Sequence, residues 1–169
     1  CPMDQIPDHK VDPARQWIED HFIFIVPVDE EEPDLECVLE KAATAVTRHE
    51  ARMVVIDPWN ELDHQRRRDA SLTEYTGRAI KEFKRLARRL DVHVLVAAHP
   101  TKPSTTGGDY RPTLYSSSDS AHWANKSDGG IVVYKTSAES NSVEVSIVKS
   151  RYHDQIGKPG TVRLVYSPM

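Results

Sequence analysis

Apolar runs alternate with amphipathic segments over the first two thirds of the chain. Runs rich in Val, Ile and Phe predict buried strands, at 22–26, 53–56 and 92–98. Between them, apolar residues recur at the spacing of a helix face. This spacing predicts a helix opened by Pro33-Asp34 and a long helix over 72–90. Ser71 and Glu74 form the capping box that begins the long helix.

A shorter helix is expected nearer the N-terminus, from Ala14 to about Asp20, with Asp12 as its N-cap and Pro13 in its first position. The last third of the chain is dominated by strands, at 131–134, 143–147 and 162–166. In the second of these, apolar and polar residues alternate, so one of its faces should be exposed. The segment 101–118 has almost no apolar periodicity and is predicted to be a long loop.

This order of elements predicts an α/β fold, with a mainly parallel sheet, helices on both faces and an antiparallel C-terminal extension. The 169 residues suit one domain with one core. No apolar run is long enough to span a bilayer. Cys1 and Cys37 form neither a disulfide framework nor a metal spacing, which favours a reducing, cytoplasmic setting. Because the chain begins with Cys and not Met, we expect it to be an excised fragment.

The segment 53–62 is the most informative of the chain, because its apolar run ends in Asp57. Ligands of open α/β sheets bind just beyond the carboxyl ends of such strands. Asp57 is therefore placed where it could hold a hard cation, although an Asp that begins the turn before Pro58 would look the same. His99 follows the next buried strand directly. If the two strands are neighbours, both side chains should face one crevice, where the imidazole could donate a hydrogen bond to a phosphate oxygen.

Two further groups of residues could bind anions. Lys149 and Arg151 end a strand one residue apart, so they should point the same way and could grip a phosphate. An exposed basic tip with no ligand is the alternative. The long loop combines cations with aromatic residues, a composition that suits single-stranded nucleic acid. The residues that could face such a ligand are Lys102, Tyr110 and Arg111 in the loop, and Asn125 and Lys126 in a short helix expected within 119–128.

Several catalytic motifs are absent from the sequence. It contains no phosphate-binding G-x-x-x-x-G-K-[ST], no G-x-S-x-G, no H-E-x-x-H and no paired C-x-x-C. No glycine-rich loop of this chain can therefore cradle the phosphates of a nucleotide.

Four segments, in their order along the chain, resemble the RecA-like ATPase domain of replicative helicases of the DnaB type, and especially of Twinkle-like and phage or prophage primase-helicases. They are Val54–Leu62, Ala97–Lys102, Asp119–Asp128, and Val148–Tyr152 with Gly157 and Gly160. The likeness covers about 17–166. It implies a RecA-like P-loop NTPase core, with the chain as one partial domain over 1–169.

The resemblance also implies roles for individual residues. Asp57 looks like the residue that holds Mg²⁺ through water, with Glu61 nearby, and His99 is similar in place to the sensor of the γ-phosphate of ATP. Lys149 and Arg151 match a pair that reaches into the nucleotide site of a neighbouring subunit. The implied partners are single-stranded DNA and the other subunits of a homo-hexameric ring, with ATP and Mg²⁺ as cofactors and no membrane.

The sequence departs from the family pattern in one important respect. In the family, the phosphate-binding loop and the catalytic glutamate lie upstream of the position of Cys1. We therefore expect these 169 residues alone to bind ATP poorly and not to hydrolyse it. The alternatives are a recombinase or clock-type ATPase domain of the RecA class, a module that lost catalysis and serves as a scaffold, and a metal-dependent hydrolase built on Asp57, His99 and Asp128.

Overall fold

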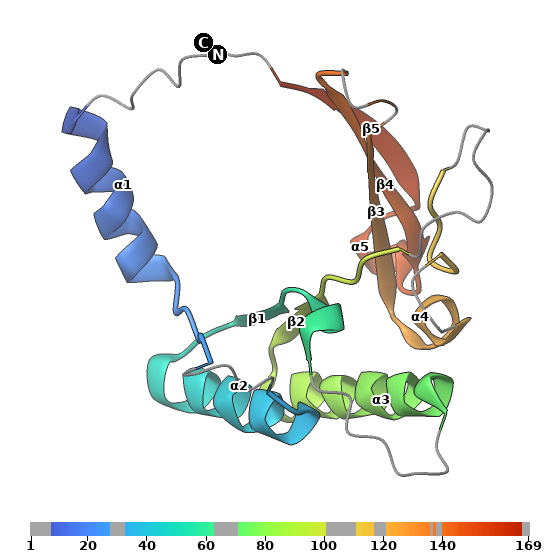
Figure 1. The fold of residues 1–169 in the computed structure, drawn as a ribbon, viewed down its shortest axis with the longest axis horizontal. Helices are drawn as coiled ribbons and strands as arrows, with labels where there is room; N and C mark the ends of the chain where they lie inside the picture. The colour runs from blue at the N-terminus through green and yellow to red at the C-terminus, as the bar shows by residue number, and fades with distance from the viewer. Residues whose placement is uncertain are drawn as a thin grey trace. The chain divides into compact units, whose positions relative to one another are not determined.

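The computed structural model describes residues 8–27, 33–62, 71–100, 111–116, 121–135, 137 and 140–166 (Figure 1). These residues belong to two compact units, 1–31 and 32–169. Most of the predicted loop over 101–118, including Lys102 and Tyr110, lies outside the described residues. Within the described ranges, no helix has both the length and the apolar character needed to pass through a bilayer.

The first unit contains helix α1 (Asp8–His21), which is longer than the sequence predicts. The predicted N-cap at Asp12 is wrong, because the helix begins at Asp8 and continues through Pro13. Pro13 lacks only the N–H that would bond to the carbonyl of His9, and the turn before it stays helical.

The predicted buried strand over 22–26 is also wrong. These residues follow α1 without forming a strand. All of them are exposed, and 73% of the surface of Phe24 is accessible to solvent. A strand is stabilised by hydrogen bonds to a neighbouring strand, and no described residue forms such a ladder with this segment. The rings of Phe22 and Phe24 stack on each other instead, with their centroids 6.0 Å apart.

The second unit begins with four elements in the predicted order: α2 (Leu35–His49), β1 (Met53–Ile56), α3 (Leu72–Leu90) and β2 (His93–Val96). Asp34 caps α2, because its side chain accepts a hydrogen bond from the N–H of Cys37 at 2.8 Å. Ser71 and Glu74 form the predicted capping box of α3. Local sequence signals therefore define where both helices begin.

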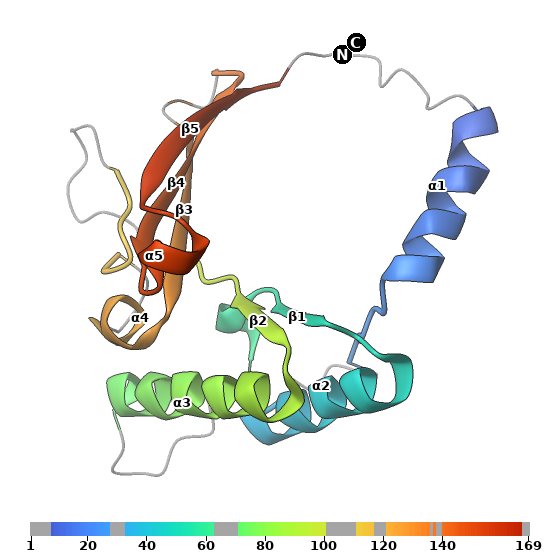
Figure 2. The same ribbon diagram turned by 180° about the vertical axis from the view of Figure 1, so that it is seen from behind.

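β1 and β2 pair in parallel, with Ile56 opposite Val96. Figures 1 and 2 show α2 and α3 on the same side of this pair. The strand residues that pack against the helices are Val54, Ile56, Val94 and Val96. The opposite face is exposed at Met53, Val55 and Leu95. The α/β class is confirmed, but the two described helices that pack on the parallel pair within the second unit, α2 and α3, cover one face of it and not both.

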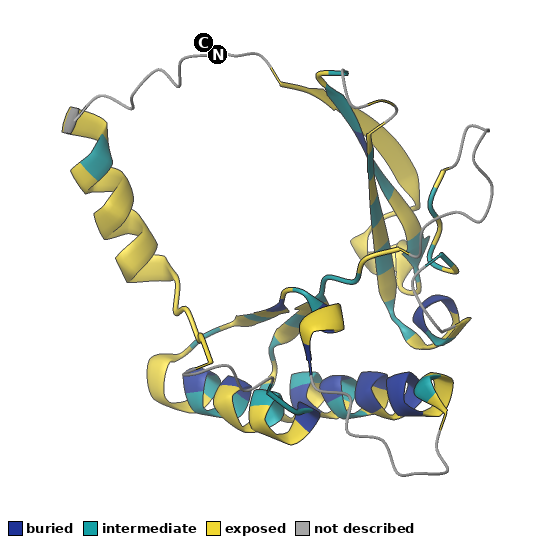
Figure 3. Cartoon of the chain, viewed as in Figure 1, coloured by how far each residue is buried: buried dark blue, intermediate teal, exposed yellow. Residues whose placement is uncertain are grey.

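A single hydrophobic core joins these elements to α4 (Ala121–Lys126), and Trp59 lies within it. Trp59 is 2% exposed, and its ring meets Phe83 and Trp123 edge-on, with centroid distances of 6.1 and 5.5 Å. Such edge-to-face pairs add to the stabilisation from burial alone. Figure 3 shows the buried positions gathered on α2 and α3.

Gly77 of α3 lies against two side chains of α4. A Cβ at this position would lie 2.7 Å from the ring of His122 and 2.6 Å from Nζ of Lys126. The missing side chain therefore permits the close contact between the two helices.

The strands of the last third are confirmed as β3 (Gly129–Lys135), β4 (Ser142–Ser150) and β5 (Gly160–Val165), with the short helix α5 (His153–Ile156) before β5. They form an antiparallel sheet in the order β3-β4-β5. This sheet is separate from the parallel pair and does not extend it, because no strand of the described residues bridges the two.

The two faces of the antiparallel sheet differ in an unexpected way. Directly paired residues share a face, so the register places apolar residues together: Ile131, Val133, Val145, Ile147, Val162 and Leu164. Most of them are exposed, whereas Glu144 on the other face is buried. The face of the sheet that carries Glu144, and not the apolar face, is therefore the one that other described residues cover.

Candidate functional site

Asp57 and His99 lie beyond the carboxyl ends of the adjacent strands β1 and β2, so the predicted adjacency of the two strands is confirmed. The backbone segments that follow β1 and β2 remain hydrogen-bonded to each other beyond the ends of the strands. The N–H of Ala97 donates to the carbonyl of Ile56 at 2.9 Å, and the N–H of Trp59 donates to the carbonyl of Ala97 at 2.8 Å. Asp57 and His99 are both exposed at this end of the sheet, where ligands of α/β folds bind.

Asn60 joins the two strand ends. Its Oδ1 accepts a hydrogen bond from the backbone N–H of His99 at 2.9 Å. Asn60 and the exposed Glu61 both belong to the short helical turn Trp59–Glu61 that follows β1. Asn60 thereby ties the segment after β2 to the turn that carries Glu61. Sequence reasoning gave Asn60 no role, although it lies inside the informative segment 53–62.

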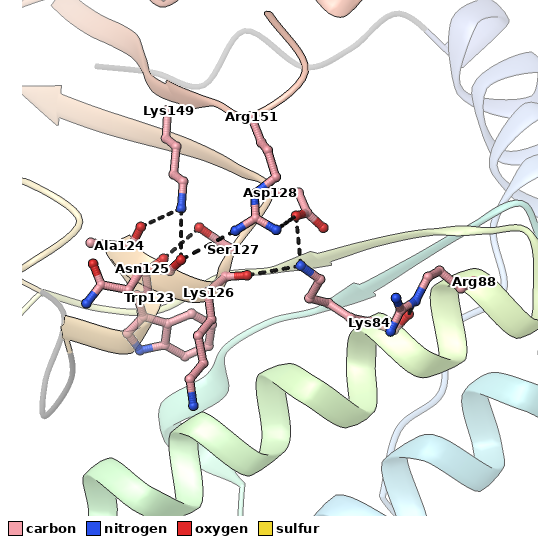
Figure 4. A network of polar contacts seen from close by, with 10 residues as sticks. All are labelled: Lys84, Arg88, Trp123, Ala124, Asn125, Lys126, Ser127, Asp128, Lys149 and Arg151. Carbon is pink, nitrogen blue, oxygen red and sulfur yellow. Dashed lines mark hydrogen bonds and ion pairs between the residues drawn. The ribbon is translucent and has the colours of Figure 1, made fainter.

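The last four carbonyl groups of α4 all accept hydrogen bonds from side chains (Figure 4). The hydroxyl of Ser127 donates to Trp123, Lys149 donates to Ala124 and Asn125, and Lys84 of α3 donates to Lys126. The end of a helix leaves these carbonyls without partners within the helix, and its dipole favours cations there. Lys149 is therefore held at the C-terminus of α4.

Asp128, just after α4, binds two cations with one carboxylate oxygen. Its Oδ1 lies 2.6 Å from Nη1 of Arg151 and 2.7 Å from Nζ of Lys84 (Figure 4). Lys149 and Arg151, predicted to reach a neighbouring subunit, thus both contact their own chain in this structure. Lys84 of α3 is a third member of the group.

The charges of this group affect the titration of Lys149. Burial lowers the pKa of the Lys149 ammonium, and the positive charge of Arg151 lowers the pKa further. Asp128 acts in the opposite direction. The group contains three cations and one carboxylate, so its charge favours an additional anion.

The nucleic-acid candidates are distributed over different elements. Asn125 and Lys126 are exposed on α4, and the backbone carbonyls of both accept hydrogen bonds from the cations described above. Arg111 is exposed but pairs with Glu144 of β4, its Nη2 lying 2.6 Å from Oε2. These three side chains are accessible, while Lys102 and Tyr110 lie outside the described residues.

The profile of the AAA domain family matches residues 8–105, more than half of the chain. The chain belongs to the AAA domain family. Twinkle homolog protein, chloroplastic/mitochondrial, from Arabidopsis thaliana is 36% identical over an alignment of 152 residues, which covers 86% of this chain and 21% of that protein. The chain therefore spans about a fifth of the length of this relative.

Two of the solved structures that resemble this AAA domain are each 25% identical to it. One is an ATPase domain that aligns over 96% of this chain and 58% of that chain, with a TM-score of 0.73. The other is a DnaB-like replicative helicase, described with its interactions with primase, which aligns over 98% of this chain and 41% of that chain, with a TM-score of 0.74. The resemblance seen in the sequence is confirmed: this is a RecA-like helicase ATPase domain of the DnaB type.

ATP and Mg²⁺ are the cofactors that the AAA domain family implies. Asp57 fits a role toward Mg²⁺, because Mg²⁺ keeps several waters and needs only one or two carboxylates besides phosphate oxygens. Its exposed side chain at the strand end leaves room for those waters. Within the described ranges, no three His, Cys, Asp or Glu side chains gather as a metal site. The structure therefore gives no support to the metal-dependent hydrolase, and Asp128 is bound to cations instead.

Glu144 is a residue of this AAA domain that sequence reasoning missed. It is buried on β4, and its two carboxylate oxygens bind Arg163 of β5 at 3.0 Å and Arg111 at 2.6 Å. The hydrogen bond from Arg163 lowers the pKa of Glu144, and the charges of both arginines lower it further, although burial raises it. Glu144 therefore fastens the segment 111–116 to the antiparallel sheet.

A pH dependence follows from the lowered pKa of Glu144. The ionised carboxylate should stabilise the fold above the ordinary pKa of a glutamate, and this stabilisation should be lost as the pH falls through the lowered pKa. Glu144→Gln should therefore lower the denaturation midpoint at pH 7, and the difference from wild type should shrink under acidic conditions. Urea unfolding of both chains from pH 7 to pH 3 measures this, and a difference that is the same at every pH would contradict it.

Leu114 also holds the segment 111–116 on the antiparallel sheet, because its side chain packs against Gly130 of β3. A Cβ added at Gly130 would clash with both Cδ atoms of Leu114 and press against its Cγ, whereas a Cβ at Gly129 would meet only the Lys149 carbonyl, at 3.8 Å. Close packing at Gly130 therefore depends on the absence of a side chain.

Gly130→Ala should destabilise the AAA domain by about 1–3 kcal/mol, the usual cost of overpacking. Gly129→Ala is the matched control, and it should leave the midpoint of thermal unfolding nearly unchanged. The prediction would be contradicted by equal effects of the two substitutions.

Proposed function

We propose that this chain is part of the ATP-driven motor of a hexameric DNA helicase that acts in replication. The pairing of β1 with β2 supports the proposal most strongly, because it places Asp57 and His99 at the same end of adjacent strands. One residue can then hold Mg²⁺ through water while the other detects the terminal phosphate of ATP. Mg²⁺, when bound, would stabilise the charge that develops on the transferring phosphoryl group.

The other predicted residues complete this proposal. Glu61 lies on the turn after Asp57 and would assist at the nucleotide. Lys149 and Arg151 would reach the nucleotide of a neighbouring subunit, an arrangement that suits a head-to-tail ring. Arg111, Asn125 and Lys126, with Lys102 and Tyr110, would contact single-stranded DNA, where cations bind phosphates and aromatic rings stack on bases.

The sequence contains no glycine-rich phosphate loop, so the ATP phosphates would be held by residues outside these 169. In the DnaB-type domain that loop lies upstream. The parent gene should therefore encode G-x-x-x-x-G-K-[ST] before the position of Cys1, and the 169-residue chain alone should not hydrolyse ATP. A phosphate loop missing from the parent gene would instead favour a scaffold that has lost catalysis.

The decisive experiment measures ATP turnover of the full-length protein with and without single-stranded DNA. Wild-type protein should turn over ATP and respond to DNA, and Asp57→Asn should lower turnover at least about a hundredfold, because Mg²⁺ loses its carboxylate. Glu40→Gln, which removes a negative charge from an exposed position of α2, is the control and should retain full turnover. If Asp57→Asn and wild type hydrolyse ATP equally, the proposed function is wrong.

A further inference from the structure

Asp128 is the centre of a charge-sharing arrangement that the proposed function does not use. One of its oxygens, Oδ1, accepts from both Arg151 and Lys84, at 2.6 and 2.7 Å (Figure 4). Each cation therefore competes with the other for the same carboxylate oxygen. The two side chains come from different elements, since Lys84 belongs to α3 and Arg151 follows β4.

The two cations differ in how firmly they are held. Lys84 is 28% exposed and also donates to the carbonyl of Lys126 at 3.2 Å. Arg151 is 41% exposed, and its contact with the carbonyl of Asn125 is long, at 3.5 Å. A guanidinium carries five N–H donors in a fork that suits phosphate. Arg151 is therefore the cation that an incoming anion can remove from Asp128.

We propose that Asp128 is a positioning residue that holds Arg151 within its own subunit, so that a phosphate group presented by a neighbouring subunit must displace this carboxylate before Arg151 can act. Lys84 weakens the hold by sharing the same oxygen. The inference rests on the proposed function for the identity of the competing anion. The retention of Arg151 by Asp128, called the hold below, rests on the contacts of this chain.

The hold predicts opposite effects for two substitutions. Asp128→Asn removes the competing charge and should release Arg151. Lys84→Met leaves Asp128 to Arg151 alone and should tighten the pair. If Asp128 served only to stabilise the fold, both substitutions would remove an ion pair and their effects would have the same sign.

The first test uses the 169-residue chain with inorganic pyrophosphate as the probe, and follows the guanidinium NMR signal of Arg151 during a titration. Asp128→Asn should lower the pyrophosphate concentration at the midpoint about threefold, in line with the strength of a partly exposed ion pair. Lys84→Met should raise it. Asp154→Asn makes the same charge change on α5, where the exposed Asp154 lies 3.3 Å from its neighbour His153, and should leave the midpoint unchanged.

Two results of this titration would overturn the proposal. One is an unchanged midpoint in Asp128→Asn, and the other is an equal shift in Asp154→Asn, which would reflect net charge alone. Should Asp128→Asn fail to fold, as judged by its unfolding curve, the test passes to Lys84→Met, with Lys81→Met as its control because Lys81 is an exposed cation of the same helix. A lowered or unchanged midpoint in Lys84→Met, or an equal rise in Lys81→Met, would refute the proposal.

The second test measures ATP turnover of the full-length protein without DNA. Asp128→Asn should raise turnover about threefold and Lys84→Met should lower it. A loss of turnover in Asp128→Asn that resembles the loss in Arg151→Ala would overturn the inference. Normal turnover in Arg151→Ala would instead show that the proposed role of Arg151 is wrong, and the pyrophosphate titration would still decide whether Asp128 holds it.

Discussion

Arg151→Ala should lower the ATP turnover of the full-length protein by about a thousandfold. An arginine that reaches a transferring phosphoryl group from a neighbouring subunit stabilises the charge of the transition state, and such residues contribute factors of about 10³–10⁵. Arg151 is suited to this role because its side chain is 41% exposed and carries a forked set of donors. Steady-state ATP hydrolysis measures the effect, and turnover within a few-fold of wild type would refute the role.

Two controls separate this role from a structural one. Arg151→Lys keeps a cation that can pair with Asp128 but loses the forked donor, so it should fold normally and recover little turnover. Mixing inactive Asp57→Asn subunits with inactive Arg151→Ala subunits should restore some hydrolysis, because some interfaces then combine an intact Asp57 with an intact Arg151. No recovery in mixed rings would mean that the arginine does not act across the interface.

Trp59→Ala should destabilise the second unit by about 3–5 kcal/mol, the usual cost of removing a large buried aromatic side chain. Trp59 is 2% exposed and contacts Tyr75, Phe83 and Trp123 through its ring. Since whole domains are stable by only about 5–15 kcal/mol, the variant should be close to unfolding at room temperature. Urea denaturation followed by circular dichroism measures the loss.

Trp17→Ala is the matched control, because Trp17 lies on α1 and is 55% exposed. It should change the unfolding free energy by less than about 1 kcal/mol. Trp123→Phe should also be tolerated better than Trp59→Ala. The buried indole N–H of Trp123 makes no hydrogen bond within the described part of the chain, so its removal leaves no partner unsatisfied. Equal losses for Trp17→Ala and Trp59→Ala would contradict this account of the core.

The sequence predicts elements well where their apolar residues meet one another in the same core. β1, α3 and β2 are examples, because Ile56, Phe83 and Val96 contribute to one cluster. The run 22–26 is as apolar as 53–56, but composition does not reveal whether a partner strand is present, and the described residues provide none. Composition also cannot show which face of a sheet is covered, and for that reason the burial of Glu144 was missed.

The candidate site was predictable in part. Asp57 and His99 each follow an apolar run, so their positions at strand ends could be read from the sequence, and parallel pairing brings the two ends together. The Lys84–Asp128 contact joins residues 44 positions apart, and neither residue carries a local signal that names its partner. Residues that meet only through tertiary packing were accordingly the ones that sequence reasoning overlooked.

The close approach of α4 to Gly77 has a mechanical consequence for the second unit. The side chains of His122 and Lys126 fill the space that a side chain at position 77 would occupy, so they act as knobs seated over Gly77. The nearby burial of Trp123 opposes separation of the two helices. We therefore expect α3 and α4 to move as one body, because sliding α4 along α3 would carry these two side chains against neighbouring residues of α3.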